Sequence, residues 1–436
     1  MRRTTLLTAL LTTLLTAGAV AATPSANAVA GGTLSVLTYN VAGLPDGLSS
    51  GDPKKNTKLI SPRLAPYDVV NVQEDFNYHA DLYSGDTHAY RTPTSGGVPF
   101  GSGLNTLSHL PYTDLERTKW SACNGTDCLT PKGFTFSRIR LAEGAYVDLY
   151  NLHPNAGSEN ADLAARRANI TQLSSFIAAT SAGNAVIVMG DTNTRYTRAD
   201  DNIRELVNTN GLTDTWVRLT RGGQAPAVGS PALVCDPAAV TESCEVVDKI
   251  LYRGNQFITL TARDFRNDNA AFLDAEGKPL SDHYPISARL DWSLNDGIRL
   301  SDEFGGPHGS PFTDLVSSLS PVRAIAVRGG SRLDAVSLTL ADGTTTTHGG
   351  SGGTQTSLAL LPGEHLRQVT LSRGQRDGRT RVFSASFTTS QGRTLAAGEP
   401  TADTVTYTAP AGWRIAGFTG RAGDEIDRLG VIYTPA

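Results

Sequence analysis

The sequence predicts a layered α/β or α+β sandwich followed by a separate all-β domain. Three observations lead to this prediction: strand-like runs that end in polar residues, a helical segment among them, and a change of composition after about Trp292. From that point the chain holds thirteen arginines and no lysine, with frequent Gly and Thr and almost no helical periodicity. We therefore expect a first domain over residues 31–292, a linker near 293–295 and a second domain over 296–436.

Strands and helices are expected in a regular order along the first domain. Residues 33–40 alternate as a strand, and 55–67 look helical before a second strand over 68–74. Apolar residues at helical spacing over 159–182 predict a long helix that ends before Gly183. The remaining expected elements are a strand within 101–111, a hairpin over 133–152, strands at 185–191 and 245–254, and a last strand after His283.

The N-terminus has the pattern of a secretory signal. Arg2 and Arg3 precede an apolar stretch over residues 6–22, and residues 26–28, Ala-Asn-Ala, supply a small-residue cleavage site. We therefore expect residues 1–28 to be a signal peptide and the protein to be secreted and extracellular. No long apolar span follows, so no transmembrane anchor is expected.

The chain is mildly acidic. Its formal net charge is −4, and loss of the signal would remove two arginines and no acid, which gives −6. Proteins that bind duplex nucleic acid usually carry basic side chains along the phosphates. The charge argues against that class, although Arg166, Arg167, Arg195 and Arg198 leave a local basic stripe open.

The four cysteines form two close pairs in loop-like sequence. An exported chain meets an oxidising environment, which favours the local disulfides Cys123–Cys128 and Cys235–Cys244. Metal binding by these cysteines is the poorer interpretation, because neither spacing resembles a zinc knuckle and the histidines lie elsewhere.

A set of polar residues lies at or near the ends of the predicted strands. Carboxylate and amide oxygens suit a hard divalent ion such as Mg²⁺, and histidines suit the base and the donors that phosphoester hydrolysis needs. Each residue alone also fits a turn or a surface position, so their recurrence in order is what favours a metal-dependent site. The set comprises Asn40, Glu74, His153, Asn155, Asp191, Asn193, Asp248, Asp282 and His283.

The motifs TYN, QE, HPN, GDTN, VDKI and SDHYP occur in this order along the first domain. Together they resemble the endonuclease/exonuclease/phosphatase superfamily over about Leu34 to Trp292. The resemblance implies a four-layer α/β sandwich, the DNase I-like fold, and a metal-dependent phosphoric diester hydrolase. It implies Mg²⁺ as the cofactor, with Mn²⁺ and Ca²⁺ as alternatives.

The resemblance also implies roles at the metal and at the leaving group. Asn40 and Glu74 would hold the metal, with Asp282 nearby. His153 would hydrogen-bond the phosphate and assist the leaving group. Asn155 replaces the residue more usual after that histidine and is included as a candidate phosphate contact.

The attacking water is assigned to a second group of residues by the same resemblance. His283 would act as the general base, oriented by Asp248. An opposite charge beside an imidazole makes it more basic, so Asp248 would also raise the basicity of His283. Asp191 and Asn193 would place the nucleophile and bind a phosphate oxygen.

Two segments narrow the substrate. The opening TYNVAGLP and the stretch CNGTDCLTPKGF are similar to secreted sphingomyelinases of the phospholipase C type. This implies a phosphodiester lipid head group, rather than DNA, as the substrate. The alternatives are an extracellular deoxyribonuclease-like nuclease on the same scaffold, and a carbohydrate-binding protein whose first domain is inactive.

Peripheral membrane contact stays open at this point. Sphingomyelinases that attack membranes enter lipid through an aromatic-rich hairpin, and the sequence shows no clear hairpin of that kind. The apolar run Val98–Phe100 is too short to count as one. No obligate protein partner is implied.

The second domain resembles the jacalin-type lectins, on FGGPHGSPFTD, HGGSGG, LLPGEHLRQV and GFTGRAGDEIDRLGVIY. The resemblance covers about Asp296 to Tyr433 and implies a three-sheet β-prism that binds glycans. Backbone groups at Gly305 or Gly306 and the late motif Gly423 to Asp427 would contact the sugar. The alternative is that Asp427 only caps its loop in a domain that has lost sugar binding.

Overall fold

The structure is a computed structural model that describes residues 30–436 except 50 and 319. The expected signal peptide, residues 1–28, lies outside the described residues. Among the helices of the described chain, none is long and apolar enough to cross a membrane.

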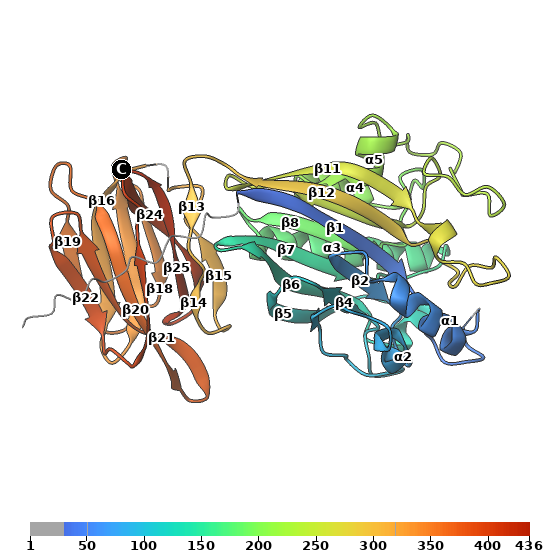
Figure 1. Ribbon diagram of the computed structural model, residues 1–436, viewed down its shortest axis with the longest axis horizontal. Helices are drawn as coiled ribbons and strands as arrows, with labels where there is room; N and C mark the ends of the chain where they lie inside the picture. The colour runs from blue at the N-terminus through green and yellow to red at the C-terminus, as the bar shows by residue number, and fades with distance from the viewer. Residues whose placement is uncertain (1–29, 50, 319) are drawn as a thin grey trace, which may run out of the picture.

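Two six-stranded sheets form the centre of the first domain (Figure 1). One has the order β11-β12-β1-β2-β4-β3, and the other has the order β5-β6-β7-β8-β10-β9. The first sheet contains β1 (Gly31–Asn40), β2 (Val69–Gln73), β3 (Tyr90–Arg91), β4 (Asn105–Ser108), β11 (Ile258–Asn267) and β12 (Ile286–Leu294). The second contains β5 (Tyr112–Lys119), β6 (Gly133–Ala142), β7 (Ala145–Leu152), β8 (Ala185–Asp191), β9 (Thr213–Asp214) and β10 (Asp248–Arg253).

The strands that carry the polar residues run side by side. β1 pairs in parallel with β2, so that Asn40 lies opposite Gln73, and β7 pairs in parallel with β8, so that Leu152 lies opposite Gly190. Carboxyl ends of parallel strands meet at one edge of a sheet. This pairing therefore gathers the residues that follow four strands at one end of the domain.

The two sheets pack face to face through an apolar core that also holds a few satisfied amides. Val36 and Val69 of the first sheet share a buried cluster with Leu149 and Val188 of the second. The amide of Asn71 donates to the carbonyl oxygens of Tyr150 and Met189, both at 3.0 Å. A buried amide without such partners would be costly, so these bonds also fix how the sheets sit on each other.

Helices cover the outer faces of both sheets, which gives the four layers. On the second sheet, α3 begins with a capping box between Glu159 and Asp162 and buries Ile170, Leu173 and Ile177. Ile60 of α1 and Leu82 of α2 are buried in a separate cluster against the first sheet. The prediction of a four-layer α/β sandwich is confirmed. The helices are α1 (Pro53–Ile60), α2 (His79–Tyr83), α3 (Asn160–Thr180), α4 (Ile203–Thr209) and α5 (Thr215–Thr220), with 3-10 turns η1 (Ser61–Arg63), η2 (Gly125–Leu129) and η3 (Asn269–Ala271).

The C-terminal domain is built from strands alone in its described part, as expected, and encloses its own apolar core. β15-β24-β25-β14, β22-β21-β20-β23 and β18-β17-β16-β19 form three faces, and the single pair Leu366 and Ile415 joins the first two. This arrangement is the predicted β-prism. Its strands are β13 (Arg299–Leu300), β14 (Phe304–Gly305), β15 (Ser310–Thr313), β16 (Val322–Gly329), β17 (Leu333–Leu340), β18 (Thr345–Gly349), β19 (Thr354–Ala359), β20 (Leu366–Arg376), β21 (Arg379–Thr389), β22 (Thr394–Gly398), β23 (Asp403–Thr408), β24 (Trp413–Ala422) and β25 (Ile426–Pro435).

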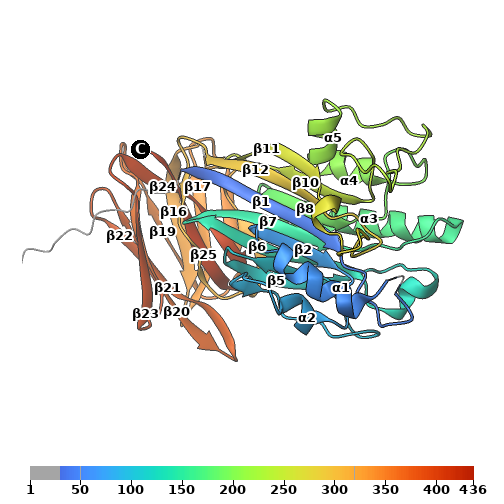
Figure 2. The same cartoon turned by 45° about the vertical axis from the view of Figure 1, so that its right-hand side comes forward.

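The two domains meet at the end of the sandwich that lies away from α1 and α2 (Figures 1 and 2). The carboxylate of Asp302 accepts hydrogen bonds from Arg140, from the backbone of Gly144 and from Tyr146, at 2.8 to 3.2 Å. Gly144 lies in the turn between β6 and β7, at the opposite end of β7 from His153. The second domain thus docks on the far side of the sandwich from the polar strand ends.

Candidate active site

Polar side chains from both sheets converge at the strand ends. Asn40 ends β1, and its amide nitrogen lies 3.1 Å from Oε1 of Glu74, directly after β2, and 3.3 Å from Oδ2 of Asp191, which ends β8. His153 follows β7, and its Nε2 lies 3.3 Å from the same Asp191 oxygen. Residues separated by more than a hundred positions in sequence therefore share one cluster.

His283 enters the cluster from the loop before β12. Its Nε2 lies 3.6 Å from Oδ2 of Asp191, and its Nδ1 lies 3.0 Å from Oδ2 of Asp248. Burial alone would lower the pKa of His283, but the charges of Asp248 and Asp191 outweigh it and hold that pKa well above its usual range. The arrangement orients one imidazole nitrogen toward the centre of the site while the other is bound to a carboxylate.

The second histidine has the opposite electrostatic character. Burial, together with the positive charges of Lys132 and His283, holds the pKa of His153 well below its usual range. His153 is therefore neutral near pH 7, while His283 readily accepts a proton. In an acid and base pair, the surroundings are expected to push the pKa values of the two groups apart, as they do here.

Two of the site residues adopt strained backbone conformations. Glu74 has φ of 57° and Asn193 has φ of 51°, in the left-handed region that costs a non-glycine residue about 1–3 kcal/mol. The turn at Glu74 needs space: a Cβ on Gly43 would lie 2.5 Å from its carbonyl oxygen, and one on Gly103 would lie 3.1 Å from its Cα. Such strain clusters at functional sites, where it fixes the direction of a side chain.

The donor set suits a hard divalent cation. Burial raises the pKa of both Glu74 and Asp191, and in the described part of the chain their ion pairs run only to histidines. The buried carboxylate of Asp191 and the partly buried carboxylate of Glu74, joined by the amide of Asn40, favour a bound positive charge. In addition, Asp191, Asp248 and His283 each place one potential ligand atom within 4.8 Å of the others.

The other predicted residues lie close by. Asn193 donates from its backbone to Oδ1 of Asp191 at 2.9 Å, and its amide lies 3.4 Å from Oδ2. The hydroxyl of Ser281, next to Asp282, lies 3.4 Å from Oδ1 of Asp282 and 2.7 Å from the carbonyl oxygen of Asn40. The loop that carries Asp282 and His283 is thus tied to the end of β1.

The glycine loop of the C-terminal domain lies beside Asp427. The backbone of Gly306 donates to the carbonyl oxygen of Asp427 at 2.7 Å, and a Cβ on Gly309 would lie 2.4 Å from Oδ2 of that residue. Arg381 holds the other carboxylate oxygen, Oδ1, at 2.9 Å. Gly423 lies across from Gly309, since a Cβ on Gly423 would be 3.9 Å from the Gly309 Cα.

Two family models match separate parts of the chain. Residues 54–243 match the family model Endonuclease/Exonuclease/phosphatase family 2, and residues 301–432 match the model Jacalin-like lectin domain. The chain joins an endonuclease/exonuclease/phosphatase domain to a jacalin-like lectin domain.

Relatives of the first domain include proteins named as sphingomyelinases. The chain is 42% identical over 263 residues to a sphingomyelinase of Mycobacterium tuberculosis, covering 58% of this chain and 52% of the relative. It is 26% identical over 278 residues to a putative neutral sphingomyelinase of Drosophila melanogaster, covering 59% of this chain and 60% of the relative. The chain spans about half the length of the mycobacterial relatives it matches.

Solved structures resemble each domain separately. Wild-type Malaysian banana lectin is 27% identical, covers 32% of this chain and 100% of its own, and has a TM-score of 0.29. A beta toxin structure from Staphylococcus aureus is 17% identical, covers 58% of this chain and 99% of its own, and has a TM-score of 0.42.

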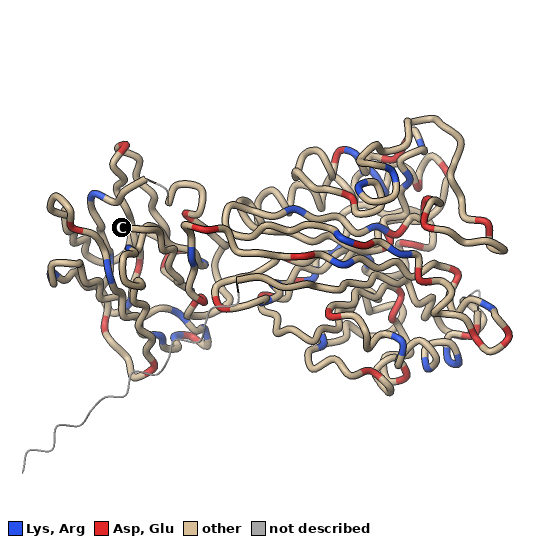
Figure 3. Tube along the Cα trace, turned by 45° about the horizontal axis from the view of Figure 1, so that its top comes forward, with Lys and Arg blue, Asp and Glu red and all other residues tan. Residues whose placement is uncertain are grey.

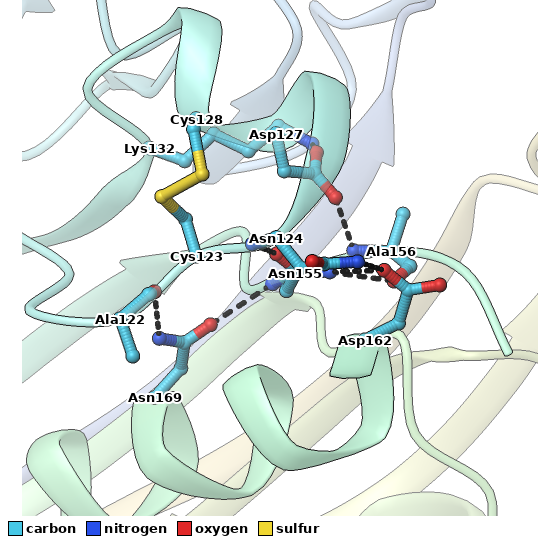
Figure 4. The surroundings of a disulfide bond; sticks show 10 residues. All are labelled: Ala122, Cys123, Asn124, Asp127, Cys128, Lys132, Asn155, Ala156, Asp162 and Asn169. Atoms are coloured by element: carbon cyan, nitrogen blue, oxygen red, sulfur yellow. Dashed lines mark hydrogen bonds and ion pairs between the residues drawn. A yellow bond between two sulfur atoms is a disulfide. The ribbon is translucent and has the colours of Figure 1, made fainter. Parts of the chain in front are cut away.

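One residue of the candidate site was missed by reasoning from the sequence. Nζ of Lys132 lies 3.2 Å from Nε2 of His153. It also forms an ion pair with Asp127 (Figure 4). Its charge also partly offsets the effect of burial on the pKa of Glu74. The available signal was its position just before β6, whose antiparallel partner β7 leads into His153.

The structure does not bring Asn155 into the cluster. Its side-chain oxygen Oδ1 accepts from the backbone of Asn124 at 2.6 Å, and its side-chain nitrogen donates to the carbonyl oxygen of Ala156 at 2.8 Å and to Asp162 at 3.2 Å (Figure 4). These contacts fasten the loop closed by the Cys123–Cys128 disulfide. Both expected disulfides are present, the second between Cys235 and Cys244.

Proposed function

We propose that the protein is a secreted, Mg²⁺-dependent phosphodiesterase that hydrolyses sphingomyelin, and that its lectin domain attaches it to glycans. The observation that carries this proposal is the joint cluster of Asn40, Glu74, Asp191 and the Asp248–His283 pair at the strand ends. The 42% identity to mycobacterial sphingomyelinases favours sphingomyelin over other diesters. Attachment to a surface would raise the local enzyme concentration there.

Glu74 would hold the metal with Asn40, and Asp282 would complete the site from the neighbouring loop. A bound divalent cation supplies positive charge for the phosphoryl oxygens, and Mn²⁺ or Ca²⁺ could replace Mg²⁺ in that role. The carboxylates of Glu74 and Asp191 support this assignment, because they have no lysine or arginine within ion-pair distance in the described chain.

His283 is the proposed general base. In the form of the enzyme in which His283 is neutral, its Nε2 takes a proton from water, the water oxygen forms a bond to phosphorus, and the bond from phosphorus to the ceramide oxygen breaks. Asp248 keeps the other nitrogen, Nδ1, protonated and stabilises the imidazolium that forms. Asp191 and Asn193 would position the water on the side of the site where Nε2 points.

His153 and Lys132 would act on the other side of the phosphate. His153 is neutral at pH 7 and so can donate one hydrogen bond to a phosphoryl oxygen, while the ammonium of Lys132 offsets negative charge. The departing ceramide alkoxide takes a proton from solvent water on this side of the site, and His283 returns its proton to the hydroxide that remains.

The surface charge favours lipid over duplex DNA. Lys and Arg are interspersed with Asp and Glu along the described trace (Figure 3). Arg166 and Arg198 both pair with Asp201, Arg167 lies 3.9 Å from Asp200, and the guanidinium of Arg195 donates to the carbonyl oxygen of Glu245. The four arginines that could have formed a phosphate-binding stripe are thus occupied within the domain.

Glycan binding would use the loop around Asp427. Its Oδ2 faces the glycine loop, where sugar hydroxyls could donate to it. Gly305 and Gly306 let this loop pack closely, because a Cβ there would lie 2.2 Å from the carbonyl oxygen of Asp427 and 2.0 Å from that of Thr380. Backbone groups of Gly305, Gly306 and Gly423 would contact the sugar. Asp427→Asn is expected to weaken glycan binding at least about tenfold and to leave hydrolysis of dispersed substrate unchanged. A glycan array comparing this variant with the unchanged protein measures the first effect.

The deciding experiment compares sphingomyelin vesicles and plasmid DNA side by side, with Mg²⁺ and with chelator. The unchanged protein is expected to release phosphocholine from the vesicles. Chelator should abolish this release, and Glu74→Ala should show none. If the protein instead nicks DNA, His283→Ala abolishes the nicking and the vesicles are not hydrolysed, the protein is a nuclease. Glycan binding without hydrolysis of either substrate would support an inactive first domain.

A further inference from the structure

Three large apolar side chains next to the active site are strongly exposed. Phe100, Leu48 and Leu129 have exposed fractions of 81%, 70% and 65%, and the first two are the highest among the large apolar residues of the described chain. A single exposed apolar side chain is ordinary, whereas several around one site mark a surface that meets an apolar partner.

Two of these side chains lie on loops that pack directly against Glu74. The loop with Leu48 follows β1, and its Gly43 backbone donates to the carbonyl oxygen of Glu74 at 3.0 Å. The loop with Phe100 returns at Gly103, whose carbonyl oxygen accepts from the backbone of Asp75 at 3.0 Å. Both loops therefore border the candidate metal site.

The third side chain borders the other half of the site. Leu129 ends η2, inside the segment that leads from the Cys123–Cys128 loop to Lys132. Arg117 of β5, the strand that precedes this segment, donates to the hydroxyl of Ser102 at 3.3 Å. This contact joins the edge of the second sheet to the loop of Phe100, so the segments of Phe100 and Leu129 lie on the same side of the domain.

We propose that Leu48, Phe100 and Leu129 form an apolar rim that inserts into the surface of a lipid bilayer and presents the active site to its head groups. The proposal rests on the proposed function, since a sphingomyelin substrate lies in a bilayer. Residues 92–104, which carry Phe100, contain no charged residue. Insertion of this loop into a bilayer surface would therefore bury no charged side chain. The rim replaces the aromatic hairpin that is not found here: the turn before Asp282 instead carries Asp274, Glu276 and Lys278.

The test separates membrane binding from catalysis. Cosedimentation with sphingomyelin and phosphatidylcholine vesicles, in chelator so that no hydrolysis occurs, compares the full chain with the triple variant Leu48→Ser, Phe100→Ser, Leu129→Ser. Vesicle affinity is expected to fall about tenfold or more, because three apolar side chains no longer enter the acyl boundary. The matched control is Val316→Ser with Leu361→Ser, two exposed apolar residues of the lectin domain, and it should bind as the unchanged chain does.

A second measurement guards against a folding defect. The ratio of kcat/KM on vesicles to kcat/KM on a soluble short-chain phosphocholine diester should fall about tenfold in the triple variant. Unchanged vesicle affinity, or an equal loss on both substrates, would overturn the proposal. If the unchanged chain hydrolyses neither substrate, the proposed function fails, while the vesicle affinities still decide whether the rim binds lipid.

Discussion

Oδ2 of Asp248 lies 3.0 Å from Nδ1 of His283, and the sheet fixes the direction of this contact. Asp248 begins β10 and is paired with Asp191 of β8, so the two carboxylates sit side by side on neighbouring strands. The imidazole bridges them, with one nitrogen near each. The orientation of the proposed base therefore follows from strand register as well as from its own loop.

Replacement of Asp248 by Asn should lower kcat by about 100-fold or more. The amide cannot stabilise the imidazolium that forms when His283 takes a proton, and it no longer enforces the required tautomer. Steady-state kinetics on sphingomyelin measure the effect. KM should change little, and Asp200→Asn, at an exposed acid, should behave as the unchanged protein does. A normal kcat in Asp248→Asn would remove this residue from the mechanism.

Much of this site could be predicted because several of its residues end or directly follow a strand that is recognisable in sequence. The apolar run of β8 breaks at Gly190 into Asp191, and β2 ends just before Glu74. Parallel pairing of buried strands then requires these ends to meet. The order of the motifs along the chain is therefore sufficient to assemble the cluster without coordinates.

Lys132 and Asn155 show where such reasoning stops. The contact of Lys132 with His153 depends on the antiparallel register of β6 and β7, which periodicity alone does not supply. Asn155 lies two residues after His153 but turns into the disulfide loop, because Asn124 and Asp162 satisfy its amide there. Sequence proximity to a site residue does not decide which way a loop side chain points.

Lys132→Ala should reduce kcat/KM by about 10- to 100-fold. The ammonium lies 3.2 Å from Nε2 of His153, the proposed phosphate contact, so its removal leaves developing negative charge less well stabilised. Lys132→Arg should recover part of the loss, since it keeps the charge. Kinetics of the three proteins at saturating Mg²⁺ give the comparison. Equal activity of the Ala and Arg variants would show that charge at this position is irrelevant.

Mg²⁺ should stabilise the folded protein through Glu74. A ligand that binds only the folded state adds about 2.7 kcal/mol at 100 times its Kd, so the Tm of the first domain should rise with Mg²⁺ concentration. Glu74→Gln should abolish this rise, because it removes a buried negative charge at the cation site. Differential scanning calorimetry with and without chelator measures it independently of activity. A Tm shift that persists in the variant would place the cation elsewhere.

The junction between the domains should depend on Glu303. Its carboxylate lies 2.9 Å from Arg138 of the first domain and 3.7 Å from Arg428 of the second, and it accepts from Thr419. Removing one partner of a buried ion pair costs about 3–5 kcal/mol because the other charge stays buried.

Glu303→Ala should therefore separate the unfolding of the two domains into distinct calorimetric transitions and speed proteolysis near residues 293–297. Glu399→Ala, at an exposed acid of the same domain, is the control. If Glu303→Ala leaves a transition pattern like that of the control, the junction is held by its apolar contacts instead.

Glu364 should make the lectin domain sensitive to acid. Hydrogen bonds from Arg393 are the main cause that lowers the pKa of Glu364 to about 2, from an ordinary value of 4.5, and the backbone of Leu361 and the hydroxyl of Thr389 contribute as well. A carboxyl whose pKa is lower in the folded state stabilises that state fully above its unfolded value. The contribution is lost as pH falls from about 4.5 toward about 2.

Glu364→Gln should therefore lower the Tm of the lectin domain at neutral pH, and the difference from the unchanged protein should shrink to nothing near pH 2. Thermal unfolding of both proteins across this pH range measures the difference in Tm. The protonation of other carboxyls affects both proteins alike and cancels in that difference. Asp403→Asn, which breaks the exposed pair with Arg373, should change Tm little at any pH because solvent screens that pair. A Tm difference for Glu364→Gln that is the same at pH 7 and near pH 2 would contradict the proposed role of its charge.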